Sequence, residues 1–321
     1  MEAALKVMYD TVTKIQSLNK REPEKMDLSV VIVNWNVKEL LSKQLETIFF
    51  YTKDINFEII VVDNQSKDGS VTHLRQKFRD EILHKRLKII ANDFNAGFAK
   101  ANNQGYEMAT GKYILFMNPD MLMTNNSFKK MFDLMESRPE VGIATCRLLY
   151  GDKSLQPNVK KFPTLCSQVL VLLKMHHFLS WTPCLKNYLM KDFKYTSEKE
   201  VDQVMGAFLF TRKKIMDEIG GWDEDYWLWW EDMEMCKRVK DLGHKIIFAP
   251  VTEVIHFEGK SFAQTFGLTK QKRFNKGMLI YFKKHHSKLE YYTLWALQPL
   301  SWGLTLLTQL FKIKARPQSR V

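Results

Sequence analysis

Acidic and aromatic side chains are concentrated in one stretch of the sequence, residues 217–234. The stretch contains eight carboxylates and no Lys or Arg, together with four of the chain's eight tryptophans. A solvated acidic face would explain the charge but not the interleaved rings. Carboxylates accept hydrogen bonds from sugar hydroxyls, while aromatic rings provide large flat surfaces for the C–H faces of a sugar. We therefore interpret this stretch as part of a carbohydrate site.

Two adjacent acids in this stretch, Glu231 and Asp232, open a helix that the pattern predicts over residues 233–242. The positive end of a helix dipole favours ionised carboxylates. One of the two acids is then available as a general base that takes a proton from a hydroxyl group. The alternative is that both acids only cap the helix.

An aspartate, Asp63, ends a predicted strand at a position suited to a nucleotide. Its carboxylate could accept a hydrogen bond from a base N–H or a ribose hydroxyl. The alternative is a turn aspartate that binds nearby backbone amides. No glycine-rich dinucleotide or phosphate-loop motif follows any predicted strand, so a nucleotide must be held in another way.

A second aspartate, Asp120, stands in the motif Asn118-Pro119-Asp120 after another predicted strand. One aspartate together with substrate phosphates suffices to bind Mg²⁺ or Mn²⁺. His256 ends the last predicted strand, and an imidazole beside a carboxylate can complete a Mn²⁺ site. We therefore place metal ligands at Asp120 and His256. The alternatives are a turn or N-cap aspartate and a structural histidine.

These side chains need a scaffold that brings the ends of several strands together. Short apolar runs alternate with helix-like segments in the first 120 residues, which is typical of βαβ units and of a parallel sheet buried on both faces. Functional loops of such a sheet follow the carboxyl ends of its strands. The predicted strands cover residues 28–33, 57–62, 87–90 and 113–117, and the predicted helices cover residues 38–51, 70–78 and 98–109.

The second half of the chain is less regular. Residues 150–203 have weak periodicity and several prolines, and we interpret them as an insertion or an acceptor-side region. At the other end of the chain, residues 1–27 predict a short amphipathic helix and a linker, and their charges argue against a signal peptide. Further predicted helices cover residues 127–138 and 213–219, and further predicted strands cover residues 204–211, 245–248 and 252–256.

Composition excludes several classes of protein. An apolar fraction of 45% and a charged fraction of 26% are not those of a disordered, collagen-like or disulfide-scaffold chain. The net charge of +12 is local, because residues 270–321 hold eleven Lys or Arg and one acid. A nucleic-acid-binding protein more often carries its basic stripe on the folded body. We therefore expect no nucleic-acid partner, and an anionic surface that meets the basic tail.

The cysteines are isolated in the sequence, so no zinc or redox motif is present. We expect them to be reduced, buried thiols in a cytoplasmic protein. They are Cys146, Cys166, Cys184 and Cys236.

An uncharged segment over residues 291–311 lies between basic residues. Its length permits a membrane span, but its glutamines, its proline and its hydroxyl side chains oppose one. Its Tyr and Trp residues, with lysines on both sides, suit a membrane interface. We expect a segment that lies on an anionic membrane; a span, or packing against the protein or a homodimer partner, are the alternatives.

Taken in order, the motifs resemble those of the family-two glycosyltransferases, especially the bacterial rhamnosyltransferase-like branch. The resemblance covers roughly residues 28–262, and the order of the motifs makes it highly specific. The matching motifs are SVVIVNWN, IIVVDNQSKDGS, NDFNAGFAKANNQG, ATGKYILFMNPD, GAFLFTRK, IGGWDEDYWLWWEDMEMCKRVKDLGHKI and VIHFEGKS.

The resemblance implies an α/β GT-A fold, a nucleoside-diphosphate-sugar donor and inversion at the anomeric carbon. It matches Asp63 to the base-binding aspartate and Asp120 to the metal-binding position of the DxD motif. Asp232 matches the catalytic base of the ED motif, and Glu231 would position the acceptor or the base. His256 matches the histidine that joins the metal or diphosphate site.

The resemblance also assigns supporting residues. We expect Gly97 to permit close approach of the nucleotide and Asn102 and Asn103 to build the wall beside it. The motif departs from the family at Asn118, which leaves Asp120 as the charged ligand, and the bulky residues 227–230 could narrow the acceptor pocket. The remaining donor-side residues are Asn34, Asn36, Asn64 and Asn118, and the acceptor-side residues are Gly206, Ala207, Trp229 and Trp230.

We therefore expect a metal-dependent inverting glycosyltransferase of bacterial surface-polysaccharide synthesis, peripheral at the inner face of the cytoplasmic membrane. The cofactor would be Mg²⁺ or Mn²⁺, the donor a nucleoside-diphosphate sugar with dTDP-rhamnose as the first choice, and the acceptor a saccharide or lipid-linked saccharide. The alternatives are a UDP-hexose or GDP-sugar donor and a catalytically silent scaffold at the membrane. The expected division is a linker (1–27), a GT-A domain (28–262, with halves 28–120 and 121–262) and a C-terminal helical segment (263–321).

Overall fold

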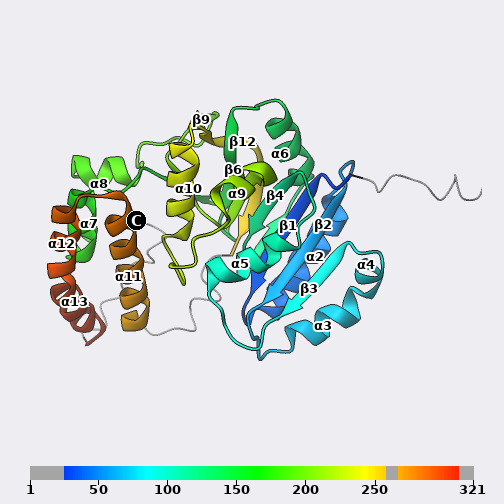
Figure 1. Cartoon of the computed structure of the whole chain (residues 1–321), viewed down its shortest axis with the longest axis horizontal. Helices are drawn as coiled ribbons and strands as arrows, with labels where there is room; N and C mark the ends of the chain where they lie inside the picture. The colour runs from blue at the N-terminus through cyan, green and yellow to red at the C-terminus, as the bar shows by residue number, and fades with distance from the viewer. Residues whose placement is uncertain (1–24, 258–266, 311–321) are drawn as a thin grey trace, which may run out of the picture.

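The computed structural model describes residues 25–257 and 267–310, and its centre is a mixed β-sheet (Figure 1). The strand order along the main path of the sheet is β3-β2-β1-β4-β11-β6-β12-β5. The first four strands along the chain are β1 (Leu28–Asn34), β2 (Phe57–Asp63), β3 (Leu87–Ala91) and β4 (Tyr113–Met117). These agree with the predicted strands to within one residue at each end.

The first half of the sheet is parallel, so its carboxyl ends share one edge. β1 lies between β2 and β4, and the register places Asn34 opposite Asp63. The parallel arrangement follows from connections that contain helices, because a crossover is needed to return the chain to the same edge. The polar residues after these strands are therefore neighbours in space.

The second half of the sheet departs from the predicted elements. The two strands predicted over residues 245–256 form one long strand, β12, with register shifts along its pairing with β6. The central strand β6 has no predicted counterpart. The strands of this half are β5 (Met121–Met123), β6 (Val141–Leu149), β7 (Leu155–Gln156), β8 (Val159–Lys160), β9 (Lys199–Glu200), β10 (Gln203–Val204), β11 (Phe208–Arg212) and β12 (Lys245–His256).

Helices cover both faces of the sheet, and each face has its own apolar core. Side chains of α2 and α6 pack with one face, and side chains of α5, α9 and α10 pack with the other. These helices of the α/β body are α2 (Lys38–Tyr51), α3 (Ser70–Lys77), α4 (Arg79–Leu83), α5 (Phe98–Glu107), α6 (Ser127–Glu136), α9 (Lys213–Ile219) and α10 (Glu231–Asp241).

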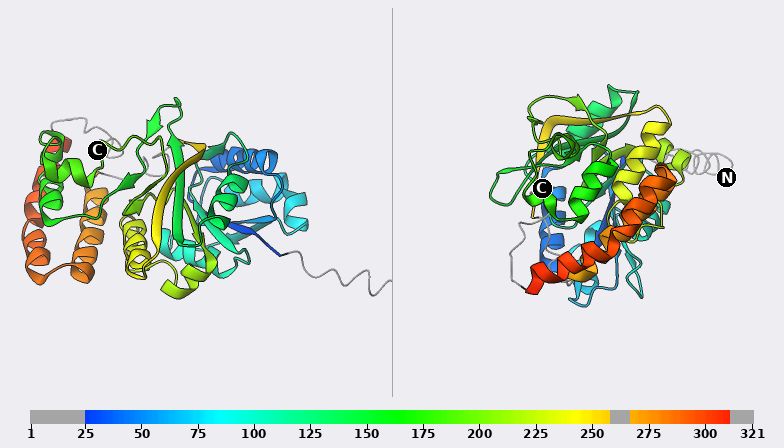
Figure 2. Two further views of the ribbon diagram at one scale, coloured as in Figure 1. Left: turned by 90° about the horizontal axis from the view of Figure 1, so that it is seen from above. Right: turned by 90° about the vertical axis from the view of Figure 1, so that its left-hand side faces the viewer.

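A second group of helices lies beside the α/β body, on the side of α10 (Figures 1 and 2). It combines residues from the middle of the chain with the C-terminal part, and it has an apolar core of its own. Its elements are α7 (Leu165–Leu172), the short 3₁₀ helix η1 (Met175–His177), α8 (Pro183–Tyr188), α11 (Gly267–His285), α12 (Lys288–Ala296) and α13 (Gln298–Leu310).

The uncharged segment over residues 291–311 is not one continuous helix. Its described part belongs to α12 and α13, which are separated at Leu297. Among the described residues, no helix is both long and apolar enough to cross a bilayer. The predicted N-terminal helix and the loop with Gly259 and Ser261 lie outside the described residues.

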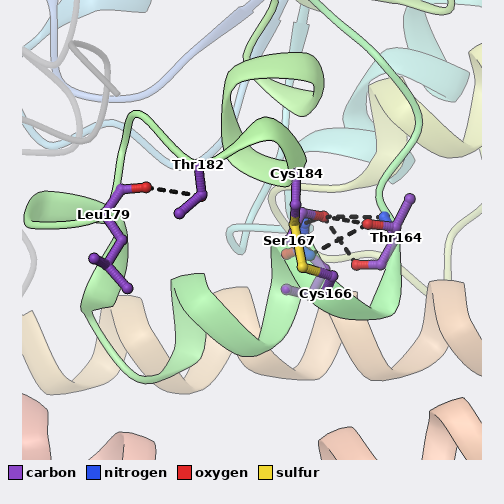
Figure 3. Close-up of a disulfide and its surroundings, with 7 residues drawn as sticks. Thr164, Cys166, Ser167, Leu179, Thr182 and Cys184 are labelled. Carbon is purple, nitrogen blue, oxygen red and sulfur yellow. Dashed lines mark hydrogen bonds between the residues drawn. A yellow bond between two sulfur atoms is a disulfide. The ribbon is translucent and has the colours of Figure 1, made fainter.

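The cysteine prediction is wrong for two of the four residues. Cys166 of α7 and Cys184 of α8 form a disulfide, with their Cα atoms 6.4 Å apart (Figure 3). That spacing lies within the usual range for a disulfide. The pair is separated by 18 residues, and only the packing of α7 against α8 brings the two together. Cys146 and Cys236 are free and buried, as predicted.

Candidate active site

The polar ends of the strands line a pocket at the carboxyl edge of the sheet. Asn64, Gly97, Asn118 and Asp120, from three different loops, all border it. The same pocket is bordered by Trp227 and Leu228 and by Arg273 of α11. The sequence-predicted donor residues are therefore only partly assembled here, and a helix from the C-terminal group closes the pocket.

Asp63 is buried beside this pocket and is already hydrogen-bonded within the chain. Its Oδ1 accepts from Asn34 Nδ2 at 2.7 Å, and its Oδ2 accepts from the Ser66 backbone N–H at 2.9 Å. Asn36 stabilises the same turn, since its Oδ1 accepts from the Lys67 backbone N–H at 2.7 Å. These bonds are those expected of an aspartate that stabilises a turn, which was the alternative role for Asp63. Each carboxylate oxygen of Asp63 still has a second lone pair that could accept a hydrogen bond from a ligand.

Asn64, which follows β2, lies at the pocket, whereas the asparagines of α5 make contacts within the scaffold. Asn64 Nδ2 donates to the Gly97 carbonyl at 3.0 Å, which fixes the pocket wall. Asn102 Nδ2 donates to the Phe98 carbonyl of its own helix. Asn103 is bonded to both backbone polar groups of Trp222. The structure therefore does not bring Asn102 and Asn103 into the pocket, because their amides join α5 to its surroundings.

Gly97 has a steric role at the pocket wall. Its φ is +89°, and a Cβ added there would lie 2.7 Å from both Cδ1 and the carbonyl oxygen of Trp227. The Phe98 N–H donates to the same Trp227 carbonyl at 2.8 Å. Gly97 therefore allows close approach of Trp227, whereas the sequence analysis expected close approach of the nucleotide. The contact between Gly97 and Trp227 fixes the position of the pocket wall.

Asp120 and His256 face each other at the base of the pocket. The His256 Nε2 atom lies 3.3 Å from Asp120 Oδ1 and 3.3 Å from Asn118 Nδ2. On the other side of the ring, His256 Nδ1 lies 2.9 Å from the amide oxygen of Gln156. A carbonyl oxygen can only accept, so Nδ1 carries the proton. In the neutral ring the Nε2 lone pair then points toward Asp120.

This pair of residues has the chemistry of a cation site. Asp120 is 5% exposed, and its Oδ1 has no hydrogen-bond partner among the described residues. A ring protonated on both nitrogens would donate to Asp120, whereas in the neutral ring Nε2 and Asp120 Oδ1 are two acceptors 3.3 Å apart, and a cation near both would stabilise them. Among the described residues, no three side chains of His, Cys, Asp or Glu form a metal cluster. A cation bound by these two side chains would take further oxygen ligands from water or a substrate.

Gln156 contacts His256 on the side of the ring opposite Asp120, and no motif in the sequence pointed to it. It lies on β7 within the segment 150–203, is fully buried, and orients the His256 ring.

We expect Gln156→Met to lower Mn²⁺ affinity by about 10- to 100-fold, the usual cost of losing such a partner. Gln156→Glu, which keeps an acceptor, should restore most of it. Free Mn²⁺ measured by EPR titration checks this prediction; equal affinities in Met and Glu variants that unfold at the same temperature would contradict it.

Glu231 and Asp232 begin α10; Glu231 is buried and Asp232 is partly buried. Asp232 accepts from the Gly206 N–H at 3.0 Å and from the Met233 N–H at 2.8 Å. Burial raises the pKa of Asp232, although these backbone donors and the charge of Lys160 oppose the rise. Burial and the adjacent Asp232 raise the pKa of Glu231 well above its ordinary value. The pKa of each carboxyl group is therefore shifted upward, as is common for carboxyl groups in functional sites.

Gly206 and Ala207 connect this carboxyl pair to the pocket. The Gly206 N–H donates to Asp232, and the Ala207 carbonyl accepts from the Asn118 N–H at 3.0 Å. Two consecutive residues thus tie the ED pair to the turn that carries Asp120. A side chain at Gly206 would lie 3.3 Å from the Asp232 Cβ, so a small residue is required there.

The tryptophans of residues 217–234 serve mainly the core. Trp222 is 2% exposed and packs edge-on against Phe98 and Phe116. Trp230 is 4% exposed and packs against α11, so its predicted place on the acceptor side is wrong. Trp229 also turns toward α11, where its ring contacts Phe274. Both residues have positive φ, and that turn of the backbone directs their rings away from the pocket.

Arg273 is a pocket residue that the sequence analysis missed, and it packs on Trp227, one of the bulky residues expected to narrow the pocket. The Arg273 guanidinium lies 3.8 Å from the centre of the Trp227 ring, which is close enough for a cation–π interaction. Burial lowers the pKa of Arg273, but an arginine stays charged at neutral pH. The pocket therefore contains a fixed positive charge as well as Asp120. Arg273 lies outside the matched motifs, and only the packing of α11 brings it to the pocket.

Two family profiles match the chain. The profile of "Glycosyl transferase family 2" matches residues 29–218, which is more than half of the chain. A second profile, described as "N-terminal domain of galactosyltransferase", matches residues 189–260. Together they span the sheet and the segment that contains the ED pair.

Characterised relatives and a solved structure agree with the profiles. The chain is 25% identical to "Rhamnosyltransferase WbbL" of Escherichia coli, over 71% of this chain and 82% of the relative. It is 22% identical to "N-acetylglucosaminyl-diphospho-decaprenol L-rhamnosyltransferase" of Mycobacterium tuberculosis, over 86% and 89%. Its fold matches that of the mannosyltransferase PcManGT from Pyrobaculum calidifontis, solved with GDP-Man and Mn²⁺. That match has a TM-score of 0.53 and 13% identity, and covers 94% of this chain and 81% of the other.

Proposed function

Because the chain belongs to glycosyl transferase family 2 and has a GT-A fold, we propose that it is an inverting, metal-dependent glycosyltransferase of bacterial surface-polysaccharide synthesis. The observation that carries the proposal is the link between its two acidic motifs. Gly206 and Ala207 join the partly buried Asp232 carboxylate to the turn that holds Asp120. A proton acceptor is thereby held beside a pocket suited to a charged donor.

The donor is proposed to be a nucleoside-diphosphate sugar, with dTDP-rhamnose first and UDP-hexose or GDP-sugar as alternatives. The first choice follows the printed names of the two relatives, both of which are rhamnosyltransferases. The pocket offers Arg273 for the diphosphate, and Asp63 stands at the end of β2 for the nucleoside. Asn34 and Asn36 then act through the turn around Asp63, not as direct ligands.

Asp120 and His256 are proposed to hold Mg²⁺ or Mn²⁺, with the donor's phosphates as further ligands. The fit rests on the unpartnered Asp120 oxygen and on the Nε2 lone pair that Gln156 directs toward it. The GT-A neighbour from Pyrobaculum was solved with Mn²⁺. Held there, a divalent cation supplies positive charge that stabilises the departing diphosphate.

Asp232 is proposed to act as the general base. Its carboxylate takes the proton of an acceptor hydroxyl while that oxygen forms a bond to C1 of the donor sugar. The bond from C1 to the diphosphate oxygen breaks on the opposite face, and the nucleoside diphosphate leaves with the bonding electrons. One displacement inverts C1, so no covalent bond to a carboxylate forms. Glu231, whose pKa burial raises most strongly, is proposed to position the acceptor as a neutral acid.

The acceptor is proposed to be a saccharide or a lipid-linked saccharide that reaches Asp232 past Gly206 and Leu228. The protein would work at the inner face of the cytoplasmic membrane, where its C-terminal helices would meet anionic lipid. We also propose that the chain divides into a GT-A domain that ends near residue 262 and a C-terminal helical segment. A homodimer is part of the same proposal.

Release of nucleoside diphosphate from a panel of dTDP-, UDP- and GDP-sugars tests the proposal. Each donor is incubated with the protein with and without Mn²⁺, with extracted lipid-linked saccharides present as acceptors. We expect metal-dependent release from one donor. If no donor releases nucleoside diphosphate and no free nucleoside diphosphate binds, the proposal is contradicted. That result would favour a GT-A scaffold without catalytic activity.

A further inference from the structure

A second hollow lies in the C-terminal helical group, between α11 and the pair α12 and α13. It has a volume of about 540 Å³ and is lined by lysines and aromatic rings. We call it the α11 groove. Its defining residues are Lys272, Lys276, Lys283, Leu279, Trp295 and Trp302.

The groove is held open by polar contacts beneath it. Gln271 Nε2 donates to Asn275 Oδ1 at 2.7 Å, and Asn275 Nδ2 donates to Ser301 Oγ at 3.2 Å. All three residues are buried. Such a ladder fixes α11 against α13, because breaking it would leave polar groups unpaired in the interior. The groove is therefore a preformed feature of the fold.

The rim of the groove carries an excess of positive charge. Lys272, Lys276 and Lys283 form no direct ion pair with any described residue, and no Asp or Glu lines the groove. Asp225 lies near enough to Lys276 and Lys283 for their charges to lower its pKa, but its direct partner is Lys284, which also pairs with Asp223. Three lysines around a hollow that no carboxylate lines favour an anionic ligand.

The same rim exposes large aromatic rings. Trp295 is 58% exposed and Trp302 is 37% exposed, and Lys272 lies 5.8 Å from the centre of the Trp302 ring. Leu300 and Leu306 on α13 are also exposed. Tryptophan beside lysine is the combination found where a protein meets the headgroup region of a bilayer. A small soluble anion would bind the lysines but would make no apolar contact with the exposed Trp and Leu side chains.

We infer that the α11 groove binds the phosphate headgroup of an anionic lipid, with the first carbons of the lipid chains against Trp295 and Leu279. This inference rests on the proposed function and locates its membrane contact. Lys272 in the groove is followed directly by Arg273 in the catalytic pocket, and adjacent residues on a helix point about 100° apart. One helix therefore faces the lipid with one side and the donor pocket with the next. A lipid-linked acceptor would thus have its lipid end and its sugar end on neighbouring faces of α11.

Flotation with lipid vesicles tests the inference, using the full-length protein. Wild type should float with vesicles of phosphatidylcholine containing 30% phosphatidylglycerol, and should not float with phosphatidylcholine alone. Replacing Lys272, Lys276 and Lys283 with Gln should weaken partitioning roughly 100-fold, since each lysine near an anionic surface contributes about a factor of five. Replacing Trp295 and Trp302 with Ser should weaken it at constant charge.

A matched control separates the groove from net charge. Lys43, Lys53 and Lys130 are exposed lysines of the α/β body, and changing them to Gln removes the same charge without changing the groove. This control should float like wild type. Equal flotation of the groove variant and the control, or wild-type binding to neutral vesicles, would overturn the inference. So would a dimer that only the groove variants dissociate. Nucleoside diphosphate binding by wild type is measured separately, so failure of the donor site and failure of the groove are distinguishable.

Discussion

Asp232→Asn is expected to lower the rate of sugar transfer by about 10³-fold, within the range attributed to general acid–base catalysis, while donor affinity stays near that of wild type. The amide cannot take the acceptor proton, but it has nearly the shape of the carboxylate and can still accept from the Gly206 N–H. Transfer is measured as acceptor-dependent release of nucleoside diphosphate, and donor affinity by calorimetry.

The control for this substitution lies on the same helix. Asp241→Asn changes an exposed aspartate at the end of α10 that pairs with Lys237, and it should leave transfer unchanged. If Asp232→Asn transfers sugar at the wild-type rate, the base is another group, and Glu231 is the next candidate.

The pH profile of wild type gives a second view of the same carboxyl pair. A base works only when ionised, and burial raises the pKa of Asp232 above the ordinary aspartate value. The rate should therefore fall, as the pH is lowered, at a higher pH than an exposed aspartate would give. Because Glu231 and Asp232 are adjacent and interact, the acid limb reports the pair and not one residue.

Asp120→Ala is expected to remove the metal dependence of donor binding and to weaken binding in the presence of Mn²⁺ by 100-fold or more. Loss of a residue that only orients a metal ligand already costs about 10- to 100-fold in metal affinity, and Asp120 is proposed as a direct ligand. Calorimetric titration of the nucleoside diphosphate, with and without Mn²⁺, measures the effect. Asp80→Ala, an exposed change on α4, serves as the control. Unchanged metal dependence in Asp120→Ala would exclude this role.

The nucleotide-binding half of the fold could be predicted from the sequence because its signals are local. β1, β2, β3 and β4 are short apolar runs that end in polar residues, and a buried parallel strand needs little more than that pattern. The helices α2 and α9 begin and end at the predicted residues. The edge where Asp63 and Asp120 meet then follows from the topology of a parallel sheet.

The parts that could not be predicted depend on contacts between distant segments. β6 is a mostly apolar strand interrupted by Thr145 and Arg147, and periodicity alone does not distinguish it from other buried segments. Gln156 and Arg273 reach the site only through the pairing of β7 with β6 and the packing of α11. The tryptophans were misassigned for the same reason, because a large ring in an acidic stretch can serve either a sugar or a core.

The packing of Trp230 against α11 has a consequence for how this enzyme can be divided. Tyr226, Trp230 and Met233 share one buried core with Met278 and Tyr281 of α11. The C-terminal helices therefore cover the first turn of α10. Gly277 is the contact point, since a Cβ there would lie 2.8 Å from the Trp230 ring. A chain that ends before α11 would expose the apolar side chains of Tyr226, Trp230 and Met233 to water. It would also lose Arg273 from the pocket. The C-terminal helices therefore cannot be removed without exposing the core of the α/β body at α10, and a substitution on α11 that alters the proposed membrane contact can also alter the wall of the pocket.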